Sequence, residues 1–171
     1  MLIRPKVIII IISFILIIVW AGSRCSPSSD SNEPTVKLYL SKSDKTITLT
    51  LEDYLVGVVG AEMPASFGSE ALKAQAVTAR TYTLKRLYAP VKHPQGAQMC
   101  DDIRCCQAYI DPQKYRREFG NSWYEARFAP VRRAVVATRG QIMLYKNQLI
   151  DTPYFSTCGG KTASASEVWG R

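Results

Sequence analysis

The chain has 171 residues, a formal net charge of +8 and 47% hydrophobic residues. This length allows one domain of ordinary size with short additional segments, and the hydrophobic share includes an apolar N-terminus that is not part of a globular core. The positive charge favours an anionic partner, such as a cell wall or an anionic membrane. Nucleic acid is not expected as a partner, because the basic residues are scattered and no nucleic-acid-binding motif occurs.

Residues 1–24 carry a targeting or anchoring segment. Residues 7–21 are almost entirely apolar, and Arg4 and Lys6 supply a positive flank. With its neighbours this run can reach the roughly 20 helical residues that span a membrane, which predicts a single-pass signal anchor with the domain outside the cytoplasm. A cleaved signal peptide is the alternative, since residues 21–23 are small residues typical of a cleavage site.

A domain is expected over residues 35–171, after a polar linker over 25–34. Apolar and polar residues alternate over 36–40 and over 47–51, and the residues between them are typical of a turn. This pattern predicts a β-hairpin at the start of the domain.

Two helices are predicted after the hairpin. The first has apolar residues at helical spacing and ends at Met63-Pro64. The second is expected to begin with Ser66 or Ser69 as its cap and to run to about Tyr88. Glu62 lies in the last turn of the first helix, where the negative end of the helix dipole disfavours a charged carboxylate, and such a carboxylate suits a general acid.

The second predicted helix is rich in alanine, and Gln75 and Arg80 are its polar exceptions. Two interpretations of Arg80 remain open. It could act in a site together with Glu62, or the two side chains could form a structural ion pair. Glu52, near the start of the first helix, is expected to be a solvated or capping group.

A Cys/His loop follows the second helix. His93, Cys100, Cys105 and Cys106 offer four soft ligands within 14 residues, the number and type that a closed tetrahedral zinc site requires. A disulfide between Cys100 and Cys106, or reduced structural thiols, are the alternatives. Because four protein ligands leave no open position, any zinc is expected to staple a loop and not to take part in catalysis.

The remaining segments complete a predicted α+β fold. Aromatic residues over 111–129 are expected to pack mainly into the core, with stacking on sugars as the alternative. Residues 131–138 form a short helical pattern. Two strands are predicted over 141–145 and 149–155, around a turn.

The last predicted strand leads into a glycine-containing segment that carries candidate ligand groups. Gly159 lets the backbone approach a ligand closely, and Ser156 and Thr157 offer hydroxyls for sugar oxygens. Cys158 is not expected to be a nucleophile, because the only histidine is assigned to the Cys/His loop and no activating base remains.

Several of these segments together resemble the stage II sporulation protein D family, whose relatives include amidase enhancers. The long and specific matches are residues 52–64, with Ala61-Glu62-Met63-Pro64, and residues 71–82. Residues 100–102, 106–109 and 154–160 resemble further family segments. Family members usually continue well beyond Arg171, so the chain is expected to match only the first part of the family domain.

The resemblance implies a membrane-anchored lytic transglycosylase that cleaves peptide-stripped peptidoglycan glycan strands during sporulation engulfment. Glu62 matches the catalytic acid, Arg80 a second active-site position, and the Cys segments a zinc site of some members, in which histidine often stands in place of Cys105. The expected substrate-binding residues are Gln75, Arg80, Tyr154, Ser156, Thr157 and Gly159.

A single carboxylate suffices for the implied chemistry. Protonated Glu62 donates to the glycosidic oxygen and then accepts the proton of the sugar's own primary hydroxyl, so that ring closure needs no water. Arg80 is expected to hold the lactyl carboxylate of muramic acid.

The resemblance also implies partners, namely an amidase that prepares the glycan and a membrane scaffold protein at the septal membrane of the mother cell. Two alternatives remain, a non-catalytic amidase enhancer and a structural zinc module.

Overall fold

The computed structural model describes residues 33–90, 93–155 and 157–170. The proposed membrane segment, most of the linker and Ser156 lie outside the described residues. Within these ranges, no helix combines the length and the apolar character needed to cross a membrane. Contacts divide the chain between Glu33 and Pro34, and the fold given below is that of the second unit.

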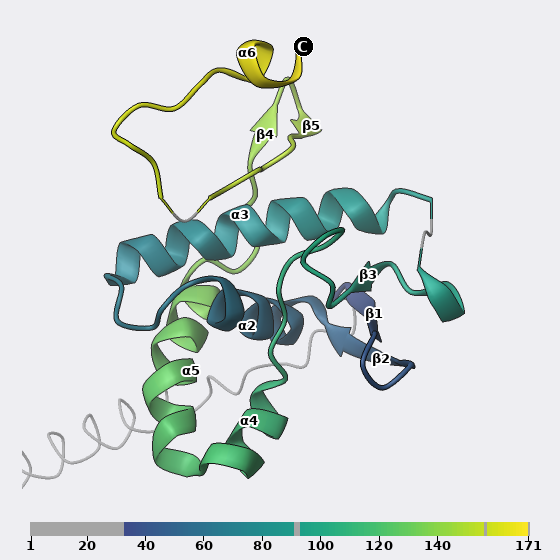
Figure 1. The fold of residues 1–171 in the computed structure, drawn as a ribbon, viewed down its shortest axis with the longest axis vertical. Coiled ribbons are helices and arrows are strands. Elements are labelled where there is room, and N and C mark those ends of the chain that lie inside the picture. Colours follow the sequence, from purple (N-terminus) through teal and green to yellow (C-terminus); the bar gives the residue numbers. More distant parts are fainter. Residues whose placement is uncertain (1–32, 91–92, 156, 171) are drawn as a thin grey trace, which may run out of the picture. The chain divides into compact units, whose positions relative to one another are not determined.

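The predicted hairpin is confirmed. Strands β1 (Thr35–Leu40) and β2 (Lys45–Thr50) pair antiparallel, with Leu38 opposite Ile47. A short third strand, β3 (Met99–Cys100), pairs with β1 in parallel and gives the order β2-β1-β3. The fold is therefore α+β as expected, but its sheet is mixed and not purely antiparallel (Figure 1). The sequence did not predict β3, because two residues are too short for a period to be recognised.

The two predicted helices are present. Helix α2 (Leu51–Glu62) begins at Thr50, whose side chain caps it, and ends at Met63. Helix α3 (Ser69–Leu87) has Gly68 at its N-cap without a side-chain bond, so the predicted serine cap is wrong. Glycine at the N-cap lowers helix stability by only a few tenths of a kcal/mol relative to serine. The helix can therefore begin at Gly68 without a side-chain cap.

Residues 111–137 form a helical corner. Helix α4 (Pro112–Phe119) is capped by Asp111, and α5 (Asn121–Ala137) follows directly after Gly120. Gly120 has φ of 85°, a left-handed value that favours glycine and that allows the chain to turn between the helices. The predicted helical run over 131–138 is the second half of α5, and Pro130 lies within this helix.

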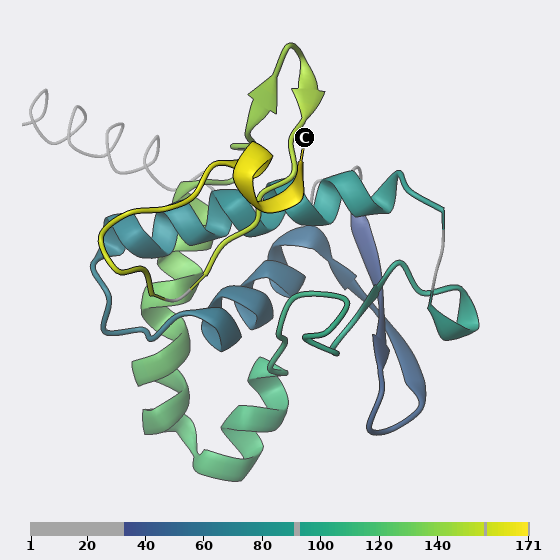
Figure 2. The same ribbon diagram turned by 45° about the horizontal axis from the view of Figure 1, so that its top comes forward.

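Helix α2 forms the centre of the core. It packs against α3, α5 and the hairpin, as both ribbon views show (Figures 1 and 2). A side chain at Gly57 would clash with the ring of Tyr109, and one at Gly60 would clash with the ring of Phe128. Glycine at these two positions therefore lets both rings pack directly against the backbone of α2. The core interpretation of the aromatic segment is confirmed for Tyr124 and Phe128, which are buried.

The C-terminal segment is less regular than expected. Strands β4 (Leu144–Tyr145) and β5 (Gln148–Leu149) are only two residues long and flank a turn with positive φ at Lys146 and Asn147. The predicted strand extending to Phe155 is wrong, since residues 150–155 form no ladder. A short helix, α6 (Ala165–Trp169), begins with a capping box.

Candidate functional site

Glu62 is the last residue of α2 and is half-buried. Its Oε1 accepts the backbone N–H of Ala108 at 2.7 Å, and its carboxylate helps to raise the pKa of the Tyr154 phenol. The hydrogen bond from Ala108 holds this carboxylate in place at the end of α2.

The loop that supplies the Ala108 donor is fixed to α2. The N–H of Ile110 donates to the carbonyl of Gly57 at 3.3 Å. Tyr109 stacks on Tyr54, with ring centroids 5.8 Å apart and an interplanar angle of 9°. Because Gly57 lets this loop approach the helix closely, the loop backbone reaches the end of α2 and contacts Glu62.

Gln107 joins this loop to α3 and to the C-terminal segment. It is buried, its Oε1 accepts the hydroxyl of Thr83 at 3.1 Å, and its Nε2 donates to the Tyr154 hydroxyl at 3.3 Å. Burial raises the pKa of Tyr154 well above its ordinary value; Gln107 opposes this rise and the Glu62 carboxylate adds to it. The phenol therefore keeps its proton and remains a donor at neutral pH.

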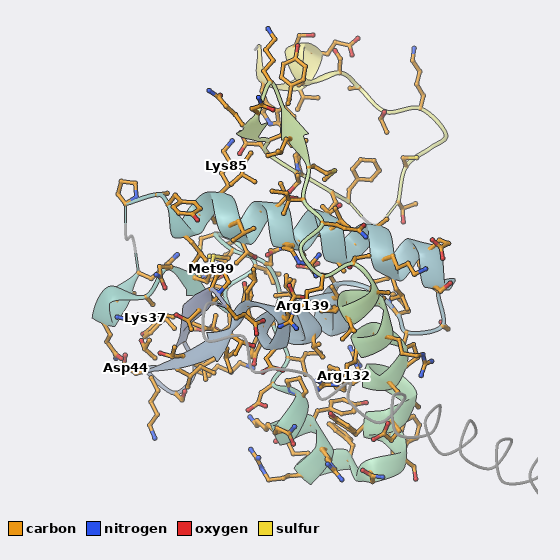
Figure 3. All side chains as sticks on the ribbon, turned by 180° about the vertical axis from the view of Figure 1, so that it is seen from behind. Lys37, Asp44, Lys85, Met99, Arg132 and Arg139 are labelled. Carbon is orange, nitrogen blue, oxygen red and sulfur yellow. The ribbon has the colours of Figure 1, made fainter. Side chains whose placement is uncertain are left out.

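Two contacts with α3 hold the segment that carries Tyr154. The hydroxyl of Thr152 donates to the carbonyl of Thr78 at 3.0 Å. Lys85, which is labelled on α3 in Figure 3, pairs with Asp151 at 2.8 Å. Among the described residues, Tyr154 is the predicted substrate-binding residue whose phenol interacts with the Glu62 carboxylate. Thr157 and Gly159 are exposed on the loop that follows, and Ser156 lies outside the described residues.

The four predicted metal ligands come together. Their donor atoms all lie within 4.8 Å of one another, with 3.4 Å between Cys106 Sγ and His93 Nε2 and 2.8 Å between Cys100 Sγ and Cys105 Sγ. The short 3₁₀ helix η1 (Pro94–Gly96) follows His93. All three cysteines are free thiols, so the structure does not support the Cys100 to Cys106 disulfide. Three sulfur donors and one imidazole fit a tetrahedral zinc ion.

Arg80 is buried at the other end of α2. Its guanidinium donates to both carboxylate oxygens of Glu52, at 2.9 and 2.6 Å, and to the carbonyl of Val135 at 3.2 Å. Of the two interpretations of Arg80, the ion pair with Glu62 is wrong, and so is the expectation that Glu52 is a solvated or capping group. Glu62 follows Glu52 by ten residue steps in α2, which is about 15 Å along the helix axis.

All three guanidinium nitrogens of Arg80 are engaged, because its third nitrogen donates to the carbonyl of Gln141 at 3.3 Å. A role for Arg80 in substrate binding stays a prediction that this geometry does not favour.

Gln75 is buried in α3, 8% exposed, and its Nε2 has no hydrogen-bond partner among the described residues. No contact with Glu62 is shown for this side chain, so its predicted substrate-binding role stays a prediction.

A groove of about 390 Å³ adjoins the end of α2, between the residues on either side of Glu62 and the corner of α4 and α5. Trp123 lines it with 66% of its side chain exposed, and Arg127 anchors its wall by donating to the carbonyl of Gly60 at 2.8 Å. Because the Trp123 indole is exposed, stacking of this ring on a sugar stays a prediction.

The fold and the site define an α+β domain in which one carboxylate at a helix end is held by a loop that also carries a Cys/His cluster. A family model described as Stage II sporulation protein matches residues 39–145. The chain belongs to this family, the SpoIID family, as the motifs around Glu62 predicted.

The relatives include sporulation proteins and an amidase enhancer. The chain is 36% identical over 150 residues to stage II sporulation protein D of Bacillus subtilis (strain 168), covering 86% of this chain and 43% of that protein. It is 33% identical over 144 residues to stage II sporulation protein D of Bacillus amyloliquefaciens, covering 84% and 42%. It is also 36% identical over 115 residues to the amidase enhancer of Bacillus subtilis, covering 67% and 13%. The chain thus spans less than half the length of these relatives.

Proposed function

We propose that the chain acts in sporulation as a lytic transglycosylase that cleaves peptide-stripped peptidoglycan strands, with Glu62 as its single acid and base. The observation that carries this proposal is the half-buried Glu62, whose carboxylate accepts the backbone N–H of Ala108 and interacts with the phenol of Tyr154. Glu52 is engaged with Arg80 at the opposite end of α2. Hydrolytic glycosidases usually require two carboxylates across the scissile bond, whereas intramolecular ring closure needs one.

The chemistry proceeds in two proton transfers. Glu62, protonated, donates to the glycosidic oxygen as the bond from that oxygen to the anomeric carbon of muramic acid breaks. The resulting carboxylate accepts the proton of the primary hydroxyl of the same sugar, whose oxygen bonds to the anomeric carbon and closes an anhydro ring. Because nucleophile and electrophile belong to one sugar residue, proximity supplies much of the rate advantage.

A structural zinc ion is the second part of the proposal. His93, Cys100, Cys105 and Cys106 would hold it, and a four-ligand ion contributes folding energy and not a site for substrate. Cys106 immediately precedes Gln107 and Ala108, so an ion at this cluster would hold the loop that contacts Glu62.

The proposed setting is the outer face of a cell membrane, to which residues 7–21 anchor the chain. There an amidase would first strip the peptides, and a membrane scaffold protein would hold the amidase and this chain together. Amidase enhancement is the second candidate function, and the similarity to the Bacillus subtilis amidase enhancer favours it.

The test uses the purified 171-residue chain in detergent with peptide-free glycan strands, and mass spectrometry of the products. We expect anhydromuramyl ends from the wild type and none from Glu62→Gln. Glu70→Gln is the matched control, because Glu70 is an exposed carboxylate paired with Lys73 on α3. If the folded wild type produces no anhydro ends, the transglycosylase proposal fails. Stimulation of an amidase that survives Glu62→Gln would then favour the enhancer.

A further inference from the structure

Two of the four candidate zinc ligands lie close enough to bond to each other. The sulfur atoms of Cys100 and Cys105 are 2.8 Å apart. The sulfur atoms of a disulfide are about 2.05 Å apart, so a movement of less than about 1 Å joins this pair. A zinc ion would need the same two sulfur atoms as thiolate ligands. One pair of sulfur atoms therefore has two possible uses.

The backbone of the Cys/His loop holds the pair in position. Cys100 lies in β3, which pairs with β1. The chain then turns back at Asp102, whose carbonyl accepts the N–H of Cys105 at 3.1 Å and that of Cys106 at 2.9 Å. The side chain of Asp102 also accepts the N–H of Arg104 at 2.9 Å. This hydrogen-bonded turn brings the sulfur of Cys105 back to that of Cys100.

The third cysteine of the loop is placed differently. Cys106 Sγ accepts the N–H of Cys100 at 3.3 Å and lies 3.4 Å from His93 Nε2. Cys106 is 8% exposed, whereas Cys105 is exposed, so a dissolved oxidant reaches Cys105 more readily. A bond between Cys105 and Cys106 is disfavoured, because adjacent Cα atoms are about 3.8 Å apart and disulfides usually span about 4.4 to 6.8 Å.

We propose that Cys100 and Cys105 are a redox-active pair whose disulfide excludes zinc from the Cys/His loop. Forming the disulfide consumes two of the four ligands, and the two that remain do not complete a tetrahedral site. The disulfide itself needs only the two thiols, whereas the exclusion of zinc rests on the zinc part of the proposed function. Disulfides persist outside the cytoplasm, which is the compartment proposed for this chain.

The oxidant is a small-molecule disulfide, and oxidised glutathione is the probe. The Cys105 thiolate attacks one sulfur of the probe, forms a mixed disulfide and releases one glutathione thiolate. The Cys100 thiolate then attacks the Cys105 sulfur, which closes the internal disulfide and releases the second glutathione. Two protein thiols thus lose two electrons and two protons, and one oxidised glutathione becomes two reduced glutathione molecules.

Zinc binding and oxidation oppose each other by mass action. A zinc ion that binds only the reduced pair stabilises the reduced form by a factor of one plus the ratio of free zinc to its dissociation constant. At free zinc about 100 times that constant, half-oxidation should need an about 100-fold higher ratio of oxidised glutathione to the square of reduced glutathione. For a two-electron couple this shift is about 60 mV.

The experiment uses the full chain in detergent with Cys25→Ser and Cys158→Ser, which remove the two cysteines outside the loop. The chain is equilibrated in glutathione buffers, either with a chelator or with buffered free zinc, and its free thiols are then alkylated. Although Cys105 is exposed, partial desolvation of its sulfur and the neighbouring Cys100 raise the pKa of this thiol to about 11. Exchange is therefore slow at neutral pH, and the oxidised fraction at equilibrium is measured.

Trypsin and mass spectrometry locate the disulfide. Cleavage after Arg104 places Cys100 on the peptide 93–104 and the other two cysteines on the peptide 105–114. A bond from Cys100 therefore links two peptides, and fragmentation of the linked pair shows which cysteine is its partner. Metal analysis of the same samples gives the zinc content of each form.

We expect a bond between Cys100 and Cys105 in the metal-free chain, the about 100-fold shift with zinc, and loss of zinc from the oxidised chain. Cys106→Ser should still form this bond. Cys105→Ser is the matched control and should need an about 10-fold or higher glutathione ratio to form any internal bond, because Cys106 faces His93.

A bond from Cys100 to Cys106 in the chain with all three loop cysteines would overturn the proposal. So would an oxidised chain that keeps its zinc, or a glutathione midpoint that zinc does not move. If zinc binds and no internal bond forms at any ratio, this inference fails while the zinc part of the proposed function stands. No glycan is present, so the outcome is independent of the cleavage assay.

Discussion

Replacing Glu52 by glutamine tests whether the buried pair at the start of α2 holds the helices together. The Arg80 side chain is 1% exposed and that of Glu52 15%, and the closest approach of the pair is 2.6 Å. Removing one partner of such a pair costs about 3 to 5 kcal/mol, because the other charge stays buried without compensation. Glutamine keeps one acceptor oxygen for Arg80. We therefore expect Glu52→Gln to lower the free energy of unfolding by about 2 to 3 kcal/mol.

The assay is urea denaturation of the full chain, followed by the fluorescence of its tryptophans. With a urea dependence of about 2 kcal/mol per molar, the midpoint should fall by about 1 to 1.5 M. The control is Glu70→Gln, whose ion pair with Lys73 lies at the surface, with side chains 82% and 37% exposed. Such a pair contributes about 0 to 0.5 kcal/mol. Equal losses from both variants would refute the view that Arg80 is a buried structural cation.

Three further predictions concern the loop, the cluster and the groove. Gly57→Ala should lower the free energy of unfolding by about 1 to 3 kcal/mol, because its methyl group meets the Tyr109 ring, whereas Gly159→Ala has open space and should cost little in denaturation. A chelator should lower the midpoint temperature of unfolding of the zinc-loaded chain, measured by scanning calorimetry. It should have no effect on the Cys105→Ser variant once metal analysis shows that this variant has lost its zinc. Trp123→Ala should weaken glycan binding by about 0.5 to 1.5 kcal/mol in calorimetric titration without changing the urea midpoint, because its ring is 66% exposed. Unchanged affinity would remove Trp123 from the binding surface.

Local features of the structure followed from the sequence. Alternation of apolar residues predicted the hairpin, and Pro64 marked the end of α2 because a proline cannot continue a helix. The spacing of His93 and the three cysteines predicted a common site, and the motif around Glu62 predicted the family. In each case the physical constraint acts between residues close in the chain, or the motif is long enough to be recognised.

Partners distant in the sequence were decided by the tertiary structure. Arg80 pairs with Glu52 and not with Glu62, because the crossing of α2 and α3 brings its side chain to the start of α2. Gln107 lies in a segment that resembles the family, but the sequence assigned it no partner, and the structure places it between Thr83 and Tyr154, which are 24 and 47 residues away. The charge and length of a side chain say that it needs a partner, but only the packing of the helices and the loop decides which partner lies within reach.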